Sequence, residues 1–197
     1  MHKITEKVLK NLPYNSFTDT DIIYLFKGSA NSRHSLVKRA LACGEILHVR
    51  KGLYCLSPIF QKTELNLYSL AERIYGPSYI SLEAALSYHG WIPEAVYAIT
   101  CVSAKRYKEF NTPLGIFRYF HIPMNMFYAC VQRIAAQNKE SFLIASPIKA
   151  LIDYIYIYKK NWTNIDPVLK SLRIDQFDLQ TTTKEELDIL YENYPSQ

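Results

Sequence analysis

Apolar positions with helical spacing divide the first third of the chain into three short predicted helices. In the third of these, Leu36, Val37, Ala40 and Leu41 share one face, and a glycine follows where helices commonly end. Thr18 precedes the second helix, with acids in the first turn, which is the pattern of a helix N-cap. A break at residues 13–16 and a turn at residues 27–31 separate the helices. The predicted helices cover residues 4–12, 19–26 and 33–43.

Two short apolar runs follow the third helix and predict a β-hairpin. Ile46 to Val49 and Leu53 to Leu56 are joined through a basic connection that ends in a glycine, which supplies the permissive backbone of a tight turn. Three helices and a hairpin within 58 residues make a complete small unit. Its predicted core consists of Ile4, Val8, Leu12, Phe17, Ile22, Leu25, Phe26, Leu36, Ala40, Leu41, Ile46 and Tyr54.

Short helices and strands alternate after residue 58 and predict a mixed α/β region. Ser81 stands where the N-cap of a helix is expected. Ser146 and Pro147 begin an almost wholly apolar helix, which predicts the buried centre of this region. Thr183 and Glu186 form a capping-box pattern before the last helix. The predicted helices cover residues 64–74, 82–89, 147–158 and 184–191, and the predicted strands residues 79–80, 96–103, 115–122 and 141–145.

Basic and polar side chains lie opposite the apolar face of the third helix, and the hairpin connection is basic too. Such a helix can lie in a DNA major groove while the hairpin touches the adjacent backbone, as in a winged helix-turn-helix. An ordinary helix and hairpin with a solvated basic face is the alternative. The candidate DNA-binding residues are Asn31, Ser32, Arg33, His34, Ser35, Lys38, Arg39, Arg50 and Lys51.

The excess positive charge lies in this same part of the chain. Residues 1–58 hold nine Lys/Arg and four Asp/Glu, whereas residues 59–197 hold 14 of each, so the net charge of +5 belongs entirely to the first part. Phosphate backbones attract such a concentration of charge. We therefore predict an α+β protein: a winged helix-turn-helix at residues 1–58 that binds double-stranded DNA, then a mixed α/β domain at residues 64–197, with the boundary near residues 57–63.

No sequence motif indicates catalysis, a metal or another cofactor. The chain has no P-loop, no GxGxxG, no GxSxG and no HExxH. Its cysteines form no CxxC pair and its histidines no HxxxH pair. Because each cysteine lies in an apolar context, we expect four reduced, buried thiols. They are Cys43, Cys55, Cys101 and Cys130.

An enzyme is the alternative from a different functional class. A nuclease pattern would place an acid on one strand and an acid-x-lysine on the next. Glu109 is expected in the polar loop that contains Arg106, Tyr107 and Lys108, and no such pattern follows it. The enzyme hypothesis, a nuclease-like protein delivered to nucleic acid by the basic unit, therefore has no positive support, and a winged helix used for protein contacts is a third option.

Two single residues invite a catalytic interpretation that we do not favour. His89 stands at the expected end of a helix, where the helix dipole favours it, and no nucleophile or acid is placed to pair with it. Asp153 is the one acid in the apolar helix, and a buried acid is more often paired than catalytic. Most of the 16 tyrosines lie in apolar runs, so we expect them to pack in the core with their hydroxyls at the surface.

No apolar run reaches the length needed to cross a membrane, and the first 12 residues lack the uninterrupted apolar core of a signal peptide. We therefore expect a cytoplasmic protein without membrane contact.

Four segments, in their order and spacing, resemble the AbiEi family, the antitoxins of type IV abortive-infection toxin–antitoxin systems. These segments are SLVKRALACGEILHVRKGLYCLSP, YISLEAALSYHGW, GIFRYFHI and ASPIKALIDYIY, which together extend over most of the chain to about Tyr158. One difference is Ile148, at a position where similar proteins tend to carry an acid. The resemblance implies an N-terminal winged helix that binds operator DNA and represses its own operon. It also implies a C-terminal domain that counters a nucleotidyltransferase-type toxin.

Overall fold

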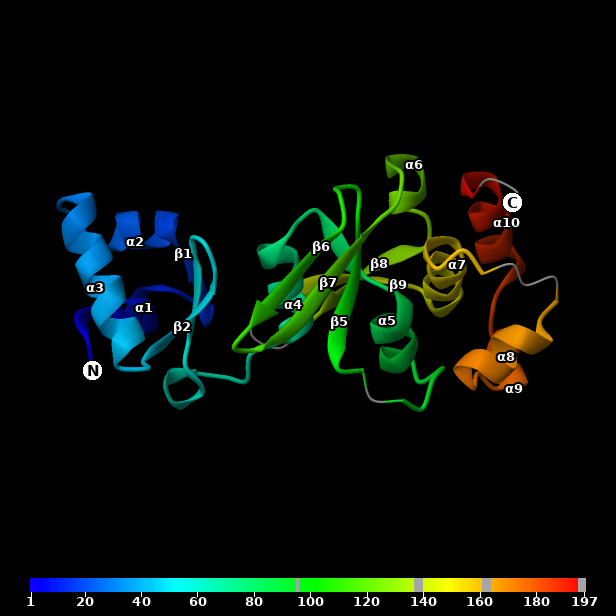
Figure 1. Cartoon of the computed structure of the whole chain (residues 1–197), viewed down its shortest axis with the longest axis horizontal. Helices are drawn as coiled ribbons and strands as arrows, with labels where there is room; N and C mark the ends of the chain where they lie inside the picture. Colours follow the sequence, from blue (N-terminus) through cyan, green and yellow to red (C-terminus); the bar gives the residue numbers. More distant parts are fainter. Residues whose placement is uncertain (95, 137–139, 161–163, 195–197) are drawn as a thin grey trace.

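The computed structural model describes residues 1–94, 96–136, 140–160 and 164–194, and its fold mixes helices and strands, as predicted. The molecule is elongated (Figure 1). A helical unit with a small sheet occupies one end, a larger sheet lies in the middle, and the last helices of the chain lie at the other end. These parts follow one another in chain order.

The first 56 residues form three helices and a three-stranded antiparallel sheet in which β3 lies between β1 and β2. The elements are α1 (Lys3–Asn11), β1 (Ser16–Thr18), α2 (Asp19–Leu25), α3 (Ala30–Ala42), β2 (Ile46–Arg50) and β3 (Leu53–Leu56). The hairpin and all three helices were predicted from the sequence. The strand β1 was not, because three residues are too few to show an alternating pattern.

Side-chain caps set where α2 and α3 begin. The Thr18 hydroxyl accepts from the Asp21 backbone N–H at 3.3 Å, and the Asp21 carboxylate accepts from the Thr18 N–H at 2.7 Å, which completes a capping box. Ser29 caps α3 by accepting from the Ser32 N–H at 3.2 Å. The helix therefore starts at Ala30, three residues earlier than predicted, and the predicted turn at residues 27–31 is shorter.

The predicted core of this unit is correct for most of its members. Leu12, Leu36, Leu41 and Tyr54 are only partly buried, and Val37 and Leu56 are buried in addition to the predicted set. The fully buried members are Ile4, Val8, Phe17, Ile22, Leu25, Phe26, Val37, Ala40, Ile46 and Leu56.

The hairpin contributes to two hydrophobic clusters. Val49, Leu53 and Cys55 point away from the first core and belong to the cluster built by the rest of the chain. Because strand side chains alternate between two faces, one strand pair can serve both cores. The two units therefore share the hairpin. The predicted boundary at residues 57–63 separates the helices and strands of the two units, but hairpin side chains pack in both cores.

The rest of the described chain builds a six-stranded mixed sheet with the order β6-β7-β5-β4-β9-β8. The pairs β5–β7 and β4–β9 are parallel, and the others are antiparallel. The elements are a 3-10 turn η1 (Pro58–Phe60), α4 (Leu67–Ile74), β4 (Ser78–Ile80), α5 (Leu82–Tyr88), β5 (Ala98–Ser103), β6 (Lys108–Thr112), β7 (Gly115–His121), α6 (Met124–Phe127), β8 (Val131–Ala135), β9 (Ser141–Ala145), α7 (Pro147–Ile157), α8 (Asp166–Leu172), α9 (Gln176–Gln180) and α10 (Lys184–Asn193).

The edge strands β6 and β8 were missed. Lys108 and Glu109 were expected in a loop, but they begin β6, where Glu109 lies opposite Arg118 of β7. The strand β6 carries mainly polar, solvent-facing side chains, and β8 mixes apolar and polar residues without strict alternation, so neither shows the pattern that marks a strand in a sequence. The helix α4 begins at Leu67 rather than at residue 64, because the Asn66 side chain caps it there.

The helix α7 begins as predicted, with Ser146 as its N-cap and Pro147 in its first turn. It is less buried than its apolar composition suggested. Only Lys149, Ala150, Leu151 and Asp153 are fully buried, and the other apolar residues of the helix are half-buried. One face of α7 thus packs on the sheet and α5, and that face contains both of its charged residues.

The predictions for thiols and tyrosines were partly wrong. Cys43 is exposed and Cys130 is half-buried, whereas Cys55 and Cys101 are buried. Burial raises the pKa of the Cys55 thiol to about 12. Tyr79 and Tyr119 are wholly buried, hydroxyl included, and each hydroxyl donates to a buried acceptor. The hydroxyls of these two tyrosines stabilise the interior rather than reaching solvent.

Candidate functional site

The helix α3 presents a continuous polar face to solvent. Val37 and Ala40 point into the core. The predicted DNA-binding residues that the structure brings to the exposed face are Asn31, Ser32, His34, Ser35, Lys38 and Arg39. The sequence between Asp21 and Glu45 contains no acidic residue, so nothing within that segment offsets these cations.

The arginines of α3 are held by the helix and by the turn before it. Arg33 is partly buried as a residue, and its guanidinium donates to the Gly28 carbonyl at 2.6 Å, which closes the turn between α2 and α3. Arg39 Nε donates to the Ser35 carbonyl at 3.2 Å. No described residue hydrogen-bonds to the side chain of Lys38. Arg39 and Lys38 are therefore better placed than Arg33 to reach an external partner.

The acid that follows α3 does not cancel its charge. Glu45 is buried at 8% exposure, and its carboxylate accepts from the Thr5 hydroxyl at 2.5 Å and from the His2 N–H at 2.8 Å. Burial by itself raises the pKa of Glu45, but these two hydrogen bonds and the charged N-terminus outweigh it and lower the pKa overall. The carboxylate is engaged by hydrogen bonds from the start of α1 inside the unit, so it does not offset the positive charge on the surface of α3.

The hairpin turn exposes one of its two predicted cations. Gly52 has a φ of +74°, which explains the glycine in this turn. Lys51 is exposed. The Arg50 guanidinium instead donates to the carbonyl of Arg73 in α4 at 3.2 Å and to that of Lys51 at 3.0 Å. Arg73 in turn donates to the Ser16 carbonyl at 2.9 Å. Arg50 thus joins the two units, a role that its position in the turn did not reveal.

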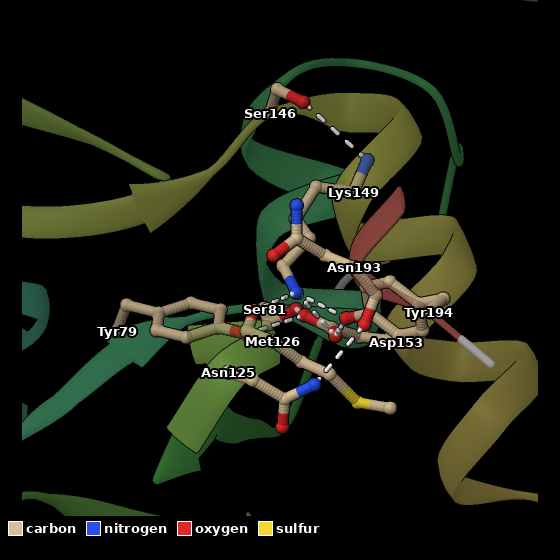
Figure 2. Close-up of polar contacts among 9 residues, drawn as sticks. All are labelled: Tyr79, Ser81, Asn125, Met126, Ser146, Lys149, Asp153, Asn193 and Tyr194. Atoms are coloured by element: carbon tan, nitrogen blue, oxygen red, sulfur yellow. Dashed lines mark hydrogen bonds and ion pairs between the residues drawn. The ribbon is translucent and has the colours of Figure 1, made fainter. Parts of the chain in front are cut away.

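A buried ion pair forms the centre of the second unit (Figure 2). Lys149 and Asp153 are both 0% exposed, and Lys149 Nζ lies 3.1 Å from Asp153 Oδ1. The ammonium also donates to the Met126 carbonyl at 2.8 Å and to the hydroxyl of Tyr194. All three of its N–H groups therefore have acceptors.

The carboxylate of Asp153 is equally well satisfied. Its Oδ2 accepts from the Ser81 hydroxyl at 2.6 Å and from the Tyr79 hydroxyl at 2.9 Å. Its Oδ1 accepts from Lys149 and from Tyr194. The prediction that Asp153 is paired is confirmed. Ser81 is the N-cap residue of α5, as predicted, but its side chain forms no cap bond: its hydroxyl donates to Asp153, and the Ala84 N–H in the first turn donates to the Thr100 hydroxyl instead.

Burial controls the protonation of this cluster. Desolvation lowers the pKa of Lys149, and the adjacent Asp153 carboxylate limits that shift. Desolvation and the same carboxylate raise the pKa of Tyr79 and Tyr194. Every polar atom of the ion pair has a partner, so the cluster holds α5, α7 and the end of α10 together and leaves no free group for chemistry. The i,i+4 spacing of Lys149 and Asp153 was the signal in the sequence that could have revealed it.

His89 also has a structural contact. It is the C-cap of α5, as the helix-end interpretation predicted, and its Nε2 lies 2.9 Å from the Ala145 carbonyl at the end of β9. Among the described residues, no three His, Cys, Asp or Glu side chains gather as a metal site.

No helix in the described part of the chain is long and apolar enough to span a membrane. A scan against models of known protein families finds no match, and a search of curated proteins finds no significant similarity.

Proposed function

We propose that residues 1–58 are a winged helix-turn-helix that binds duplex DNA, with α3 in the major groove. The observation that carries this proposal is the exposed face of α3, which combines cations with short polar side chains and is free of acids. Cations supply affinity for phosphates, and Asn, Ser, Lys and Arg side chains can form hydrogen bonds to base edges. An acid-free face of this kind is compatible with close approach to a polyanion.

The arrangement of the unit supports the same proposal. Two helices joined by a short turn precede a hairpin, and the hairpin forms a three-stranded sheet with β1. In a helix-turn-helix the second helix reads the groove with its N-terminal residues. Here those residues are Asn31, Ser32 and Ser35, at the end where Ser29 caps the helix. Lys51 in the hairpin turn would contact the neighbouring backbone.

We further propose that the protein is a repressor of its own operon and the antitoxin of a type IV toxin–antitoxin pair. This part rests on the resemblance to the AbiEi family, in which the second unit would counter a nucleotidyltransferase-type toxin. In this role the protein has no catalytic activity of its own and would act in the cytoplasm. The buried Lys149–Asp153 pair supports a non-catalytic second unit, because its polar atoms are all engaged internally.

The test is a titration of full-length protein against two duplexes: the region upstream of its own gene and a scrambled duplex of equal length. The variant Lys38→Ala/Arg39→Ala should lower the ratio of upstream to scrambled affinity, since a good base contact contributes about 1–3 kcal/mol of discrimination. Lys170→Ala/Lys184→Ala removes the same charge from α8 and α10 and serves as the control. Equal effects of both variants on the ratio would refute a reading role for α3.

A further inference from the structure

A pocket of about 440 Å³ lies in the second unit where β5 and β7 begin. It is bounded by these two strands, the α5–β5 connection, α5, α8 and the end of α7. Small-molecule sites typically have volumes of about 300–1,000 Å³ and a largely apolar lining with a few polar groups. The apolar part of the wall consists of Ile92, Val96, Ala98, Ile116 and Leu172.

Glu83 contributes a carboxylate to this pocket, and half of that carboxylate has no partner. Its Oε1 accepts from the Tyr158 hydroxyl at 3.1 Å, whereas its Oε2 is buried and has no hydrogen-bond partner among the described residues. Burial, together with the neighbouring carboxylate, raises the pKa of Tyr158, so this hydroxyl remains a donor at neutral pH. The terminal torsion of a glutamate has no sharp preference, so either oxygen can turn towards the pocket. Because buried polar atoms are nearly always paired, this carboxylate calls for a further donor.

Glu83 also carries the unbalanced charge of the pocket. Two other charged side chains line it, and each has its own partner: Glu94 pairs with Arg173 at 3.3 Å, and Arg118 pairs with Glu109 at 2.9 Å. Glu83 takes part in no ion pair among the described residues. A bound cation would therefore supply both the missing donor and the missing counter-charge.

Two tyrosine rings complete the wall. Tyr158 is 38% exposed, and its ring is held by Tyr154 and Phe120, whose ring centroids lie 4.6 and 5.7 Å away. Tyr97 is 96% exposed, so its ring is available to a ligand. Aromatic rings attract an organic cation and also cover its apolar part.

We propose that this pocket binds a small primary amine, with its ammonium group on the Glu83 carboxylate and its hydrocarbon chain along the apolar wall. This site is separate from the exposed face of α3, and the proposal does not depend on DNA binding. An anion is disfavoured, because it would meet the Glu83 carboxylate while the Arg118 guanidinium is already paired with Glu109. A neutral ligand would leave the carboxylate without a counter-charge.

The experiment is isothermal titration calorimetry of the full-length chain at neutral pH with ligands that share a hydrocarbon chain and differ in the head group. Hexylamine is protonated at this pH, as the lysine side chain is. It should bind about ten- to a hundredfold more tightly than hexanol, which is the range expected for a hydrogen bond to a charged group, and hexanoate should not bind. Butylamine should bind about 15-fold more weakly than hexylamine, because it buries two fewer methylene groups.

Three variants locate the ligand. Glu83→Gln keeps the shape of the side chain and an acceptor for Tyr158, and it should weaken hexylamine binding about ten- to a hundredfold without changing hexanol binding. Glu192→Gln removes the same charge from an exposed position on α10 and should change neither. Tyr97→Ala should weaken hexylamine binding about two- to fivefold. Far-ultraviolet circular dichroism checks folding, and the head-group comparison on the unaltered protein decides the question if Glu83→Gln does not fold.

Several results would overturn the proposal. Equal binding of hexylamine and hexanol would mean that the apolar wall alone recognises the ligand, and tighter binding of hexanoate would make Arg118 the recognising group. Absence of hexylamine binding at millimolar concentration would exclude the site. Tighter binding of a blocked Gly-Lys-Gly peptide than of hexylamine would assign the pocket to a side chain of another protein instead of a free amine. None of these results bears on the duplex titration, so the proposed function is tested separately.

Discussion

Replacing Asp153 by asparagine tests whether the buried ion pair holds the second unit together. The substitution keeps the shape of the side chain but leaves the Lys149 ammonium without a counter-charge at 0% exposure. Its remaining acceptors are neutral: the Met126 carbonyl and the Tyr194 hydroxyl. Removing one partner of a buried pair typically costs about 3–5 kcal/mol of the free energy of unfolding.

The reverse substitution should cost less. In Lys149→Met the Asp153 carboxylate keeps three hydroxyl donors, from Tyr79, Ser81 and Tyr194. The double variant Lys149→Met/Asp153→Asn buries no charge, so it should also be more stable than Asp153→Asn alone. At about 2–4 °C per kcal/mol for a chain of this size, Asp153→Asn should lower Tm by roughly 6–20 °C.

Thermal and urea unfolding at neutral pH, followed by circular dichroism, give the free energies of unfolding of the unaltered protein and the three variants. The order of stability should be unaltered protein, then Lys149→Met and the double variant, then Asp153→Asn. If Asp153→Asn costs less than about 1 kcal/mol, or if the double variant loses the sum of the two single losses, Lys149 is not held by the carboxylate and the reasoning is wrong.

Three further predictions follow from other contacts. Lys51→Ala should weaken operator and random duplex equally and reduce the salt slope by about 1 in anisotropy titrations, whereas a loss of specificity would contradict a backbone role. Burial raises the pKa of Tyr79, Tyr119 and Tyr194, so their contribution to the free energy of unfolding is complete below pH ~10 and is lost as pH rises through the raised values. Tyrosinate absorbance and circular dichroism should therefore change together above pH ~10. Ionisation of these tyrosines without unfolding would argue against their burial. A fragment of residues 1–62 exposes Val49 and Leu53, whose burial contributes about 1.5–3 kcal/mol each, so its melting temperature should lie below that of the full chain. Equal melting temperatures would show that packing of the hairpin against the second unit does not stabilise the first.

Local sequence patterns were sufficient to predict features that depend on residues close together in the chain. The Thr18 N-cap, the Thr183–Glu186 capping box, the Ser146–Pro147 start of α7 and the hairpin were predicted because each depends on residues no more than a few positions apart. The exposed face of α3 was predicted for the same reason, although its helix starts earlier than expected.

Long-range contacts decided the features that were missed. Ser81 has the local pattern of a cap, yet Asp153, 72 positions away, takes its hydroxyl. Arg50 has the local pattern of a phosphate contact, yet the Arg73 carbonyl accepts from it. The edge strand β6 exists because β7 pairs with it, and its own side chains give no sign of it. No periodicity within a short window contains this information.

The shared hairpin limits how the first unit can be exchanged between proteins. In a chimaera, a DNA-reading unit taken from elsewhere would bring a hairpin with its own outward face. That face would have to supply apolar groups matching Val49, Leu53 and Cys55, which here fill the core of the neighbouring unit. A polar outer face would bury polar groups without partners in that core, and a hairpin without an arginine at this position would lose the contact to the Arg73 carbonyl. The proposed DNA specificity is therefore more readily redesigned by substitutions on the exposed side of α3 than by transplanting a whole module.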